Sequence, residues 1–327
     1  MKVLALRFTR PLIVLAVLVL SMASAPAGAW AADKMTLRLD WIPGSEHAFM
    51  YLGKEKGWFT AEGIDLDVIA GQGSTLSVKL VGNGDNDFAF SDGATLVQAW
   101  ESGVPLVSLA VLYRDTPTVV VAKREKKIAK LEDLCGRKMG VMVKSTTYAQ
   151  FKGMLSAANV SCKFEEVPAS PGGRELMAGA VDAQHHYTFL LPVLMRQGNL
   201  DVVEIPARKY FKLYSQTLIT NRTTLTQRRE LVAGFMRAAM RSLRHAIDHP
   251  EEALAAFLKA HREAKPEYER EKLKIVNEFF TMTEPGGKGL GWQTADGWSE
   301  TAKTLARLSI TKATVDTTGK FTNEFVQ

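Results

Sequence analysis

The sequence predicts an α/β protein in which parallel sheets are covered by crossover helices. Short apolar segments with strand character alternate with segments of helical periodicity from about residue 37 to residue 220. This alternation is typical of parallel α/β sheets. After residue 220 the pattern changes to longer helices alone. The chain has 327 residues, 46% of them hydrophobic and 23% charged, which is enough for two domains of ordinary globular composition.

The segment from Leu37 to Ile69 is the first strand–helix–strand unit. Residues 37–40 alternate apolar and charged side chains, which indicates a strand. A turn follows, and Ser45 is a candidate N-cap for the next helix. The unit places Asp40 and Trp41 at the carboxyl end of a strand, where open α/β sheets usually bind ligands. No G-x-G-x-x-G motif opens the helix, so a dinucleotide-binding fold is not favoured.

The remaining elements follow from periodicity and from turn residues. Further strands are expected at 64–69, 88–90, 106–112, 118–122, 138–143, 164–167, 181–185, 201–205 and 214–220. Helices are expected at 76–81, 94–102, 130–134, 147–158, 173–179, 188–197, 226–248, 251–261, 267–282 and 297–308.

The first 31 residues have the pattern of a signal peptide. Lys2, Arg7 and Arg10 precede the apolar run 11–20, and small residues around Ala29 to Ala31 offer a cleavage site. The alternative is an uncleaved membrane anchor, but the run is shorter than the roughly 20 residues that a span needs. We therefore expect a periplasmic protein, cleaved near Ala29–Ala31, without a cysteine there to carry a lipid.

The charge of the chain gives little support to nucleic-acid binding. Cleavage would remove three basic residues and lower the formal net charge from +6 to +3. No Lys/Arg stripe is interleaved with aromatic residues.

The two cysteines are Cys135 and Cys162. An oxidising compartment allows them to pair, and each stands shortly before an expected strand. If those strands are neighbours in a parallel sheet, the sulfurs can meet. The alternative is two separate buried thiols.

A series of motifs resembles one family. L-D-W at the first strand is followed by K-G-W-F-x-x-E-G-I from Lys56, a Gly-Ser loop, and N-D-F-A-F-S-D-G from Asn86. Their order and spacing resemble the substrate-binding proteins of bacterial ABC importers that serve nitrate, sulfonate, taurine and thiamine-pyrimidine precursors. The resemblance covers about residues 35–220 and continues more weakly beyond.

This resemblance implies a type II periplasmic-binding fold, in which two α/β lobes close around a ligand by a hinge. We expect lobe one at 34–117 plus 220–327 and lobe two at 118–219, with crossovers near 116–118 and 214–220. It also implies a small-molecule ligand, an ABC transporter permease as partner, a monomer, and no cofactor or metal.

Candidate ligand contacts in lobe one lie at strand ends. Trp41 can stack on a planar ligand and Asp40 can accept a hydrogen bond from an amine; alternatively Trp41 packs in the core and Asp40 caps a turn. His47 either contacts the ligand or caps a helix. Ser74 lies between a strand and a helix N-terminus, as Thr146 does in lobe two, where backbone N–H groups favour anionic or polar oxygens. Simple N-capping is the alternative for both.

The other candidates are Ser91 and Asp92 at a third strand end, Arg114 beside the first crossover, and His186 and Tyr187 at a strand end of lobe two. Arg114 either binds a carboxylate or sulfonate bidentately or braces the hinge. The family often places an aromatic residue where Tyr187 stands. The resemblance thus predicts that Trp41 and Tyr187 form a clamp across the cleft.

Catalysis and metal binding have less support. His245 and His249 have a spacing compatible with metal binding, but the Glu of H-E-x-x-H is absent, so a solvated helix end is favoured. There is no G-x-S-x-G elbow. A eukaryotic branch that synthesises the thiamine pyrimidine carries a dense Cys motif, which two cysteines cannot provide.

The expected function is capture of a small polar or heteroaromatic molecule for an ABC importer. The L-D-W opening favours a pyrimidine precursor of thiamine. Phe49, and the run His185-His186-Tyr187, depart from the pyrimidine-binding pattern. Sulfonate or taurine binding, a ligand-loaded sensor module, and an enzyme are the alternatives.

Overall fold

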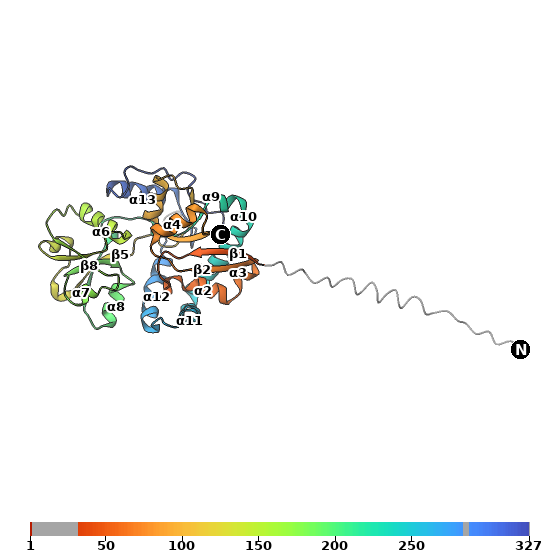
Figure 1. The fold of residues 1–327 in the computed structure, drawn as a ribbon, viewed down its shortest axis with the longest axis horizontal. Coiled ribbons are helices and arrows are strands. Elements are labelled where there is room, and N and C mark those ends of the chain that lie inside the picture. The colour runs from red at the N-terminus through yellow and green to blue at the C-terminus, as the bar shows by residue number, and fades with distance from the viewer. Residues whose placement is uncertain (2–31, 284–287, 327) are drawn as a thin grey trace. The chain divides into compact units, whose positions relative to one another are not determined.

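The computed structural model describes Met1, residues 32–283 and residues 288–326 (Figure 1). Apart from Met1, the predicted signal peptide lies outside the described residues. Residues from Asp33 onward form one compact unit. Within the described residues, no helix combines the length and the apolar character needed to cross a bilayer.

Two five-stranded sheets organise this unit. The first has the order β2-β1-β3-β10-β4 and the second the order β7-β6-β8-β5-β9. We call the first sheet with its packed helices lobe one, and the second sheet with its helices lobe two. The strands of lobe one are β1 (Asp33–Arg38), β2 (Ile64–Ile69), β3 (Phe88–Asp92), β4 (Leu106–Val111) and β10 (Gln216–Asn221). Those of lobe two are β5 (Thr118–Lys123), β6 (Lys138–Val141), β7 (Glu165–Pro168), β8 (Ala183–Tyr187) and β9 (Val202–Pro206).

The predicted α/β class is confirmed, but the sheets are mixed rather than fully parallel. Strand β10 runs antiparallel to β3 and β4, and β5 runs antiparallel to β8 and β9. Each of these strands is entered directly from the other sheet, without the crossover helix that a parallel neighbour requires. The predicted lobe boundary at 219/220 falls inside β10.

Most helices lie at the ranges that apolar periodicity predicts, but residues 58–61 and 222–227 were not predicted as helices, and the predicted helix at 130–134 is a 3₁₀ turn. The α-helices are α2 (Ala48–Glu55), α3 (Trp58–Ala61), α4 (Ser74–Asn83), α5 (Gly93–Glu101), α6 (Thr146–Ala157), α7 (Arg174–Met177), α8 (Leu191–Gln197), α9 (Arg222–Gln227), α10 (Arg229–Asp248), α11 (Pro250–Ala260), α12 (Pro266–Phe280) and α13 (Ala295–Arg307). Short 3₁₀ turns are η1 (Ser45–His47), η2 (Arg124–Lys126), η3 (Leu131–Leu134) and η4 (Ala207–Lys209).

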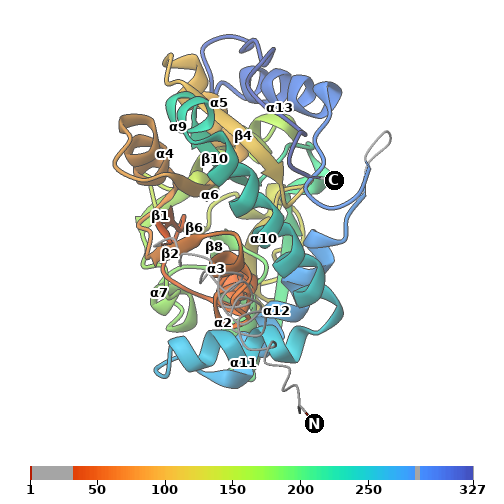
Figure 2. The ribbon, with the colours of Figure 1, turned by 90° about the vertical axis from the view of Figure 1, so that its right-hand side faces the viewer.

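The long C-terminal helices complete the core of lobe one. Helices α10 and α11 pack against α2, and Figure 2 shows α10 passing in front of the sheet towards α11. Phe235 of α10 is fully buried and stacks on Phe88 of β3, with ring centroids 3.7 Å apart. The helical tail is therefore an integral part of this core.

The expected N-cap at Ser45 is wrong. Ser45 is itself the first residue of η1, whose N-cap is Gly44, and no side chain caps that turn. The Ser45 backbone N–H instead donates to Glu269 Oε2 at 2.7 Å. A tertiary contact, 224 residues away in sequence, thus replaces the local cap.

Cys135 and Cys162 form a disulfide, which resolves the alternative left open by the sequence. They precede β6 and β7, and these strands pair in parallel, which is the arrangement that lets the two sulfurs meet. The bond closes a loop across a sequence separation of 27 residues.

Replacing both cysteines with serine is expected to lower the free energy of unfolding by about 2–4 kcal/mol, because a loop of this length restricts the unfolded chain. Urea unfolding of the oxidised protein and the variant measures the difference. Reducing agent should shift the wild type to the variant's midpoint and leave the variant unchanged; equal midpoints in oxidised protein and variant would contradict the expectation.

Candidate ligand-binding cavity

A cavity of about 700 Å³ lies between the two lobes. Its lining comes from the segments that follow the strands, from the N-termini of α4 and α6, and from α12. Lobe one contributes, among others, Asp40, Trp41, Glu46, Ser74, Tyr113, Gln216, Tyr268, Glu269 and Lys272. Lobe two contributes, among others, Lys144, Thr146, His186, Tyr187, Phe189, Leu190 and Leu194. The site is thus mixed aromatic and polar.

Six of the ten predicted contact residues line this cavity, namely Asp40, Trp41, Ser74, Thr146, His186 and Tyr187. Among the described residues, the other four are not part of the lining. His47, Ser91 and Asp92 are almost completely buried behind it, with exposed fractions of 0–1%. Arg114 donates to the backbone carbonyls of Met282, Gly289 and Trp292, all in the C-terminal part of lobe one, and a role in bracing the hinge stays a prediction.

Trp41 is held at the rim by backbone contacts to the next loop. The N–H of Gly71 donates to the Trp41 carbonyl at 2.9 Å, and that of Gly73 to the Asp40 carbonyl at 2.7 Å. A Cβ on Gly71 would lie 2.0 Å from the Leu39 carbonyl oxygen, so only glycine allows this approach. The Trp41 side chain itself is 36% exposed and therefore available to a ligand.

Asp40 is a carboxylate fixed in place by His47. His47 Nε2 lies 2.9 Å from Asp40 Oδ1, and Gln216 also hydrogen-bonds to the carboxylate. Burial alone would raise the pKa of Asp40, but the hydrogen bond and charge of His47 and the hydrogen bond of Gln216 outweigh it and lower the pKa. Asp40 is therefore an ionised acceptor at the cavity wall, positioned by His47.

A second cluster of charges forms the floor near α12. Lys272 Nζ lies 2.5 Å from Glu46 Oε2 and 3.6 Å from Glu269 Oε2, and all three side chains are at most 8% exposed. Burial would lower the pKa of Lys272, but Glu46 and Glu269 raise it to about 12, so the ammonium stays charged. Gly44 lies directly against this cluster, since a Cβ there would come within 2.1 Å of Lys272 Nζ and 2.4 Å of Glu46 Oε2.

Sequence reasoning missed this cluster, although α12 carried a signal. Glu269 and Lys272 fall at helical spacing with the apolar residues Val276 and Phe280, and all four are buried. Charged residues on the apolar stripe of a helix are rarely buried without partners. That spacing was the available sign of a buried ionic site.

Asp92 lies behind the cavity, and the pKa of its carboxyl group is shifted in the opposite direction to that of Asp40. Its carboxylate accepts from Ser215 Oγ at 2.7 Å and from the Ala94 N–H at 2.9 Å. Burial raises its pKa to about 6, with a smaller contribution from the charge of Asp40, while these hydrogen bonds oppose the shift.

Asp92→Asn is expected to become more stable relative to wild type as pH rises from about 4 to 7. The pKa of Asp92 is raised from 3.8 to about 6, so the folded protein binds this proton more tightly than the unfolded protein does. The free energy of unfolding of the wild type therefore falls by about 3 kcal/mol as pH rises through this range, whereas the variant has no such group. Urea unfolding at both pH values tests this. The exposed Asp67→Asn is the matched control; a pH-independent difference between wild type and Asp92→Asn would contradict it.

His185 and His186 supply neutral rings to lobe two. His186 Nε2 donates to the Pro171 carbonyl at 2.9 Å, and its Nδ1 accepts from the Tyr187 N–H at 3.0 Å. Burial lowers the pKa of His186 to about 4 and that of His185 to about 3. Within the described lining, Lys144 is therefore the one charged residue that lobe two contributes, and it is exposed.

Aromatic side chains from both lobes make another part of the cavity wall. Tyr187 and Phe189 have ring centroids 5.5 Å apart, and Tyr113 lies 6.2 Å from Phe189. Burial, followed by the charges of Asp92 and Asp40, raises the pKa of Tyr187 well above its usual value, so its hydroxyl stays protonated. Trp41 and Tyr187 both line the cavity, and their action as a clamp stays a prediction.

Polar contacts also join the lobes beside the cavity. Thr95 and Thr146 hydroxyls lie 3.2 Å apart, and Gln150 Nε2 lies 3.5 Å from the Asp92 carboxylate. On the α12 side, Arg196 of α8 pairs with Glu271 at 3.1 Å. These contacts hold the lobes together independently of a ligand.

Comparison with known proteins agrees with this geometry. The family model described as NMT1/THI5 like matches residues 44–253. The chain is 29% identical over 288 residues to the formylaminopyrimidine-binding protein of Halalkalibacterium halodurans, covering 83% of this chain and 84% of that one. It is 26% identical over 324 residues to the riboflavin-binding protein RibY of Chloroflexus aurantiacus, covering 93% and 89%.

A solved structure confirms the predicted fold. The periplasmic aliphatic sulphonate binding protein SsuA from Escherichia coli superposes with a TM-score of 0.68, covering 88% of this chain and 91% of that one, at 12% identity. The periplasmic-binding architecture expected from the motifs is therefore correct.

Proposed function

The chain belongs to the NMT1/THI5-like family, and we propose that it is the extracytoplasmic solute-binding protein of an ABC importer. The observation that carries the proposal is the cavity between two lobes joined by two chain crossings, lined from both sides. Such a cavity can enclose a small molecule when the lobes close. The partner would be a membrane permease, to which the loaded protein delivers its ligand.

The charges of the lining favour an aminopyrimidine over an organic anion. Asp40, Glu46 and Glu269 place three carboxylates at the wall of lobe one, and Lys272 is already paired with two of them. An amino group and a protonated ring nitrogen can donate to such a carboxylate, whereas a sulfonate would face like charge. The name of the formylaminopyrimidine-binding relative supports the same class.

A second ligand class has one observation in its favour. The N-termini of α4 and α6 both face the cavity, and Lys144 lies beside the latter, which suits an anionic oxygen. A sulfonate or taurine ligand would use this end. Lys144 is exposed, so salt screens its attraction for an anionic ligand strongly. The interaction of a cationic ligand with the less exposed carboxylates of lobe one is screened less.

Calorimetry with three ligands tests the proposal. We expect tight binding of a formylaminopyrimidine or its hydrolysed aminopyrimidine, and weak or no binding of taurine and of an alkanesulfonate. Tight sulfonate binding without pyrimidine binding would overturn the ligand class and leave the transport role intact. Recovery of chemically altered ligand after incubation would overturn the assignment as a binding protein.

Trp41→Ala is expected to weaken binding of the pyrimidine by at least about tenfold while changing the melting temperature little. The ring is 36% exposed, so its removal costs little packing, but an aromatic stacking contact is worth about 0.5–1.5 kcal/mol beyond the apolar area it buries. Calorimetry and thermal unfolding measure the two effects. Ile42→Ala, at an exposed residue that also lines the cavity, is the control. If Trp41→Ala leaves the affinity unchanged but lowers the melting temperature strongly, Trp41 has a structural role and does not contact the ligand.

A further inference from the structure

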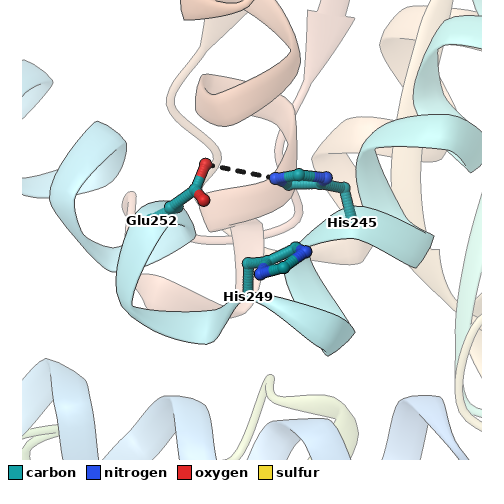
Figure 3. Close-up of side chains that lie close together, drawn as sticks. All are labelled: His245, His249 and Glu252. Atoms are coloured by element: carbon teal, nitrogen blue, oxygen red, sulfur yellow. Dashed lines mark hydrogen bonds and ion pairs between the residues drawn. The ribbon is translucent and has the colours of Figure 1, made fainter.

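Away from the cavity, the junction of α10 and α11 brings two imidazoles and a carboxylate together. His245 lies in the last turn of α10, His249 stands between the helices, and Glu252 lies in the first turn of α11. One ligand atom from each lies within 4.8 Å of the others. Figure 3 shows the three side chains turned towards one another, with the two rings on one side of the carboxylate.

We propose that these three residues form a binding site for a divalent transition metal, with Zn²⁺ as the best match. Two imidazoles and one carboxylate are the donors that Zn²⁺ accepts in open sites, where water completes the coordination. Among the described residues, this is the one group of three or more such side chains close enough to share an ion.

The local contacts prepare the residues for this role. His245 Nε2 lies 3.1 Å from Glu252 Oε2, and its ring is packed edge-on against Trp58 at 5.4 Å, which limits its rotation. His249 and Glu252 are exposed, so an ion can enter from solvent. The rings of His245 and His249 are 4.3 Å apart, so a small rotation directs both towards one ion.

A lysine ammonium group is already paired with the Glu252 carboxylate. Lys56 Nζ lies 2.6 Å from Glu252 Oε2, and both side chains are more than 40% exposed. The carboxylate is therefore already ionised and already neutralised by a flexible ammonium group. A bound metal displaces this ammonium from the Glu252 carboxylate and takes its place as the neutralising charge.

The structural consequence is a clamp between helices. An ion held by His245 and Glu252 ties the end of α10 to the start of α11, and both helices pack against α2. Because none of the three residues lines the cavity, the ion affects stability without contacting the ligand.

Calorimetric titration of tag-free protein with Zn²⁺ tests the proposal. We expect one equivalent to bind and the melting temperature to rise. His249→Asn and Glu252→Gln should each weaken Zn²⁺ binding at least about tenfold, since loss even of an outer-shell partner costs 10–100-fold. Lys56→Met should strengthen it, because the competing ammonium is gone. His261→Asn, on another turn, is the matched control and should change nothing.

The opposite results overturn the site. If Zn²⁺ does not bind, or if His249→Asn and Glu252→Gln bind it as wild type does, the three residues form no metal site. Weaker binding in Lys56→Met would also contradict the proposed competition. Circular dichroism of each variant, together with an unchanged affinity for the cavity ligand, separates loss of the site from loss of the fold.

Discussion

Asp40→Asn is expected to weaken binding of an aminopyrimidine by about 10- to 150-fold. The carboxylate is the acceptor, with its side chain 15% exposed, that His47 and Gln216 hold ionised at the cavity wall. The asparagine amide keeps the shape of the side chain but loses a charge-assisted hydrogen bond to the ligand, which is worth roughly 1.5–3 kcal/mol. Its NH₂ group is also a donor where the ligand's amino group needs an acceptor. Calorimetry with the pyrimidine ligand measures the effect.

The matched control is Asp67→Asn, which makes the same chemical change on an exposed position of β2. It should leave the affinity unchanged. Thermal unfolding of both variants shows whether Asp40→Asn also loosens the fold through His47. An affinity equal to that of wild type would mean that Asp40 does not contact the ligand and only positions His47.

Lys272→Met is expected to lower the free energy of unfolding by about 3–5 kcal/mol. The ammonium is 5% exposed and holds Glu46 and Glu269 through distances of 2.5 and 3.6 Å. Methionine has nearly the same length but leaves two buried carboxylates facing each other without a cation. Urea unfolding at pH 7 measures the loss, and the exposed Lys274→Met on the same helix provides the control.

Neutralising the carboxylates should reverse the effect. The triple variant Glu46→Gln/Glu269→Gln/Lys272→Met removes the whole charge cluster, and we expect it to recover much of the lost stability, because hydrophobic or neutral replacement of a complete buried ion group is often tolerated. If Lys272→Met unfolds like wild type, the cluster is hydrated and the burial argument is wrong.

The sequence predicted the parts of the fold that depend on local patterns. Strand alternation around Leu37 and helical spacing around Phe235 depend on neighbouring residues. The helix lies close to its predicted range, whereas the strand begins earlier than the alternation suggests and ends at Arg38. The direction of β10 could not be predicted, because it depends on which sheet the chain enters after a crossover. The missing N-cap at Ser45 also depends on a distant residue, since the Ser45 backbone N–H donates to Glu269 Oε2.

For the site, strand-end position was a good guide and residue type was not. Asp40 and Trp41 follow β1, Tyr187 is the last residue of β8, and all three line the cavity. Asp92 also ends a strand, as the last residue of β3, but its side chain accepts from the Ala94 N–H and acts as an N-cap. The choice between facing the cavity and capping a helix depends on one side-chain rotation, which sequence spacing does not determine.

The polar contacts between the lobes bear on how fast a ligand leaves. If the lobes separate to release a ligand, Arg196 has to part from Glu271 and Thr95 from Thr146, and the Arg196–Glu271 pair lies outside the cavity lining. Residence time is therefore set partly by the protein's own contacts, while recognition depends on the cavity wall. A transporter that competes for Arg196 or Glu271 could shorten that residence time and unload the protein without any change in its intrinsic preference among ligands.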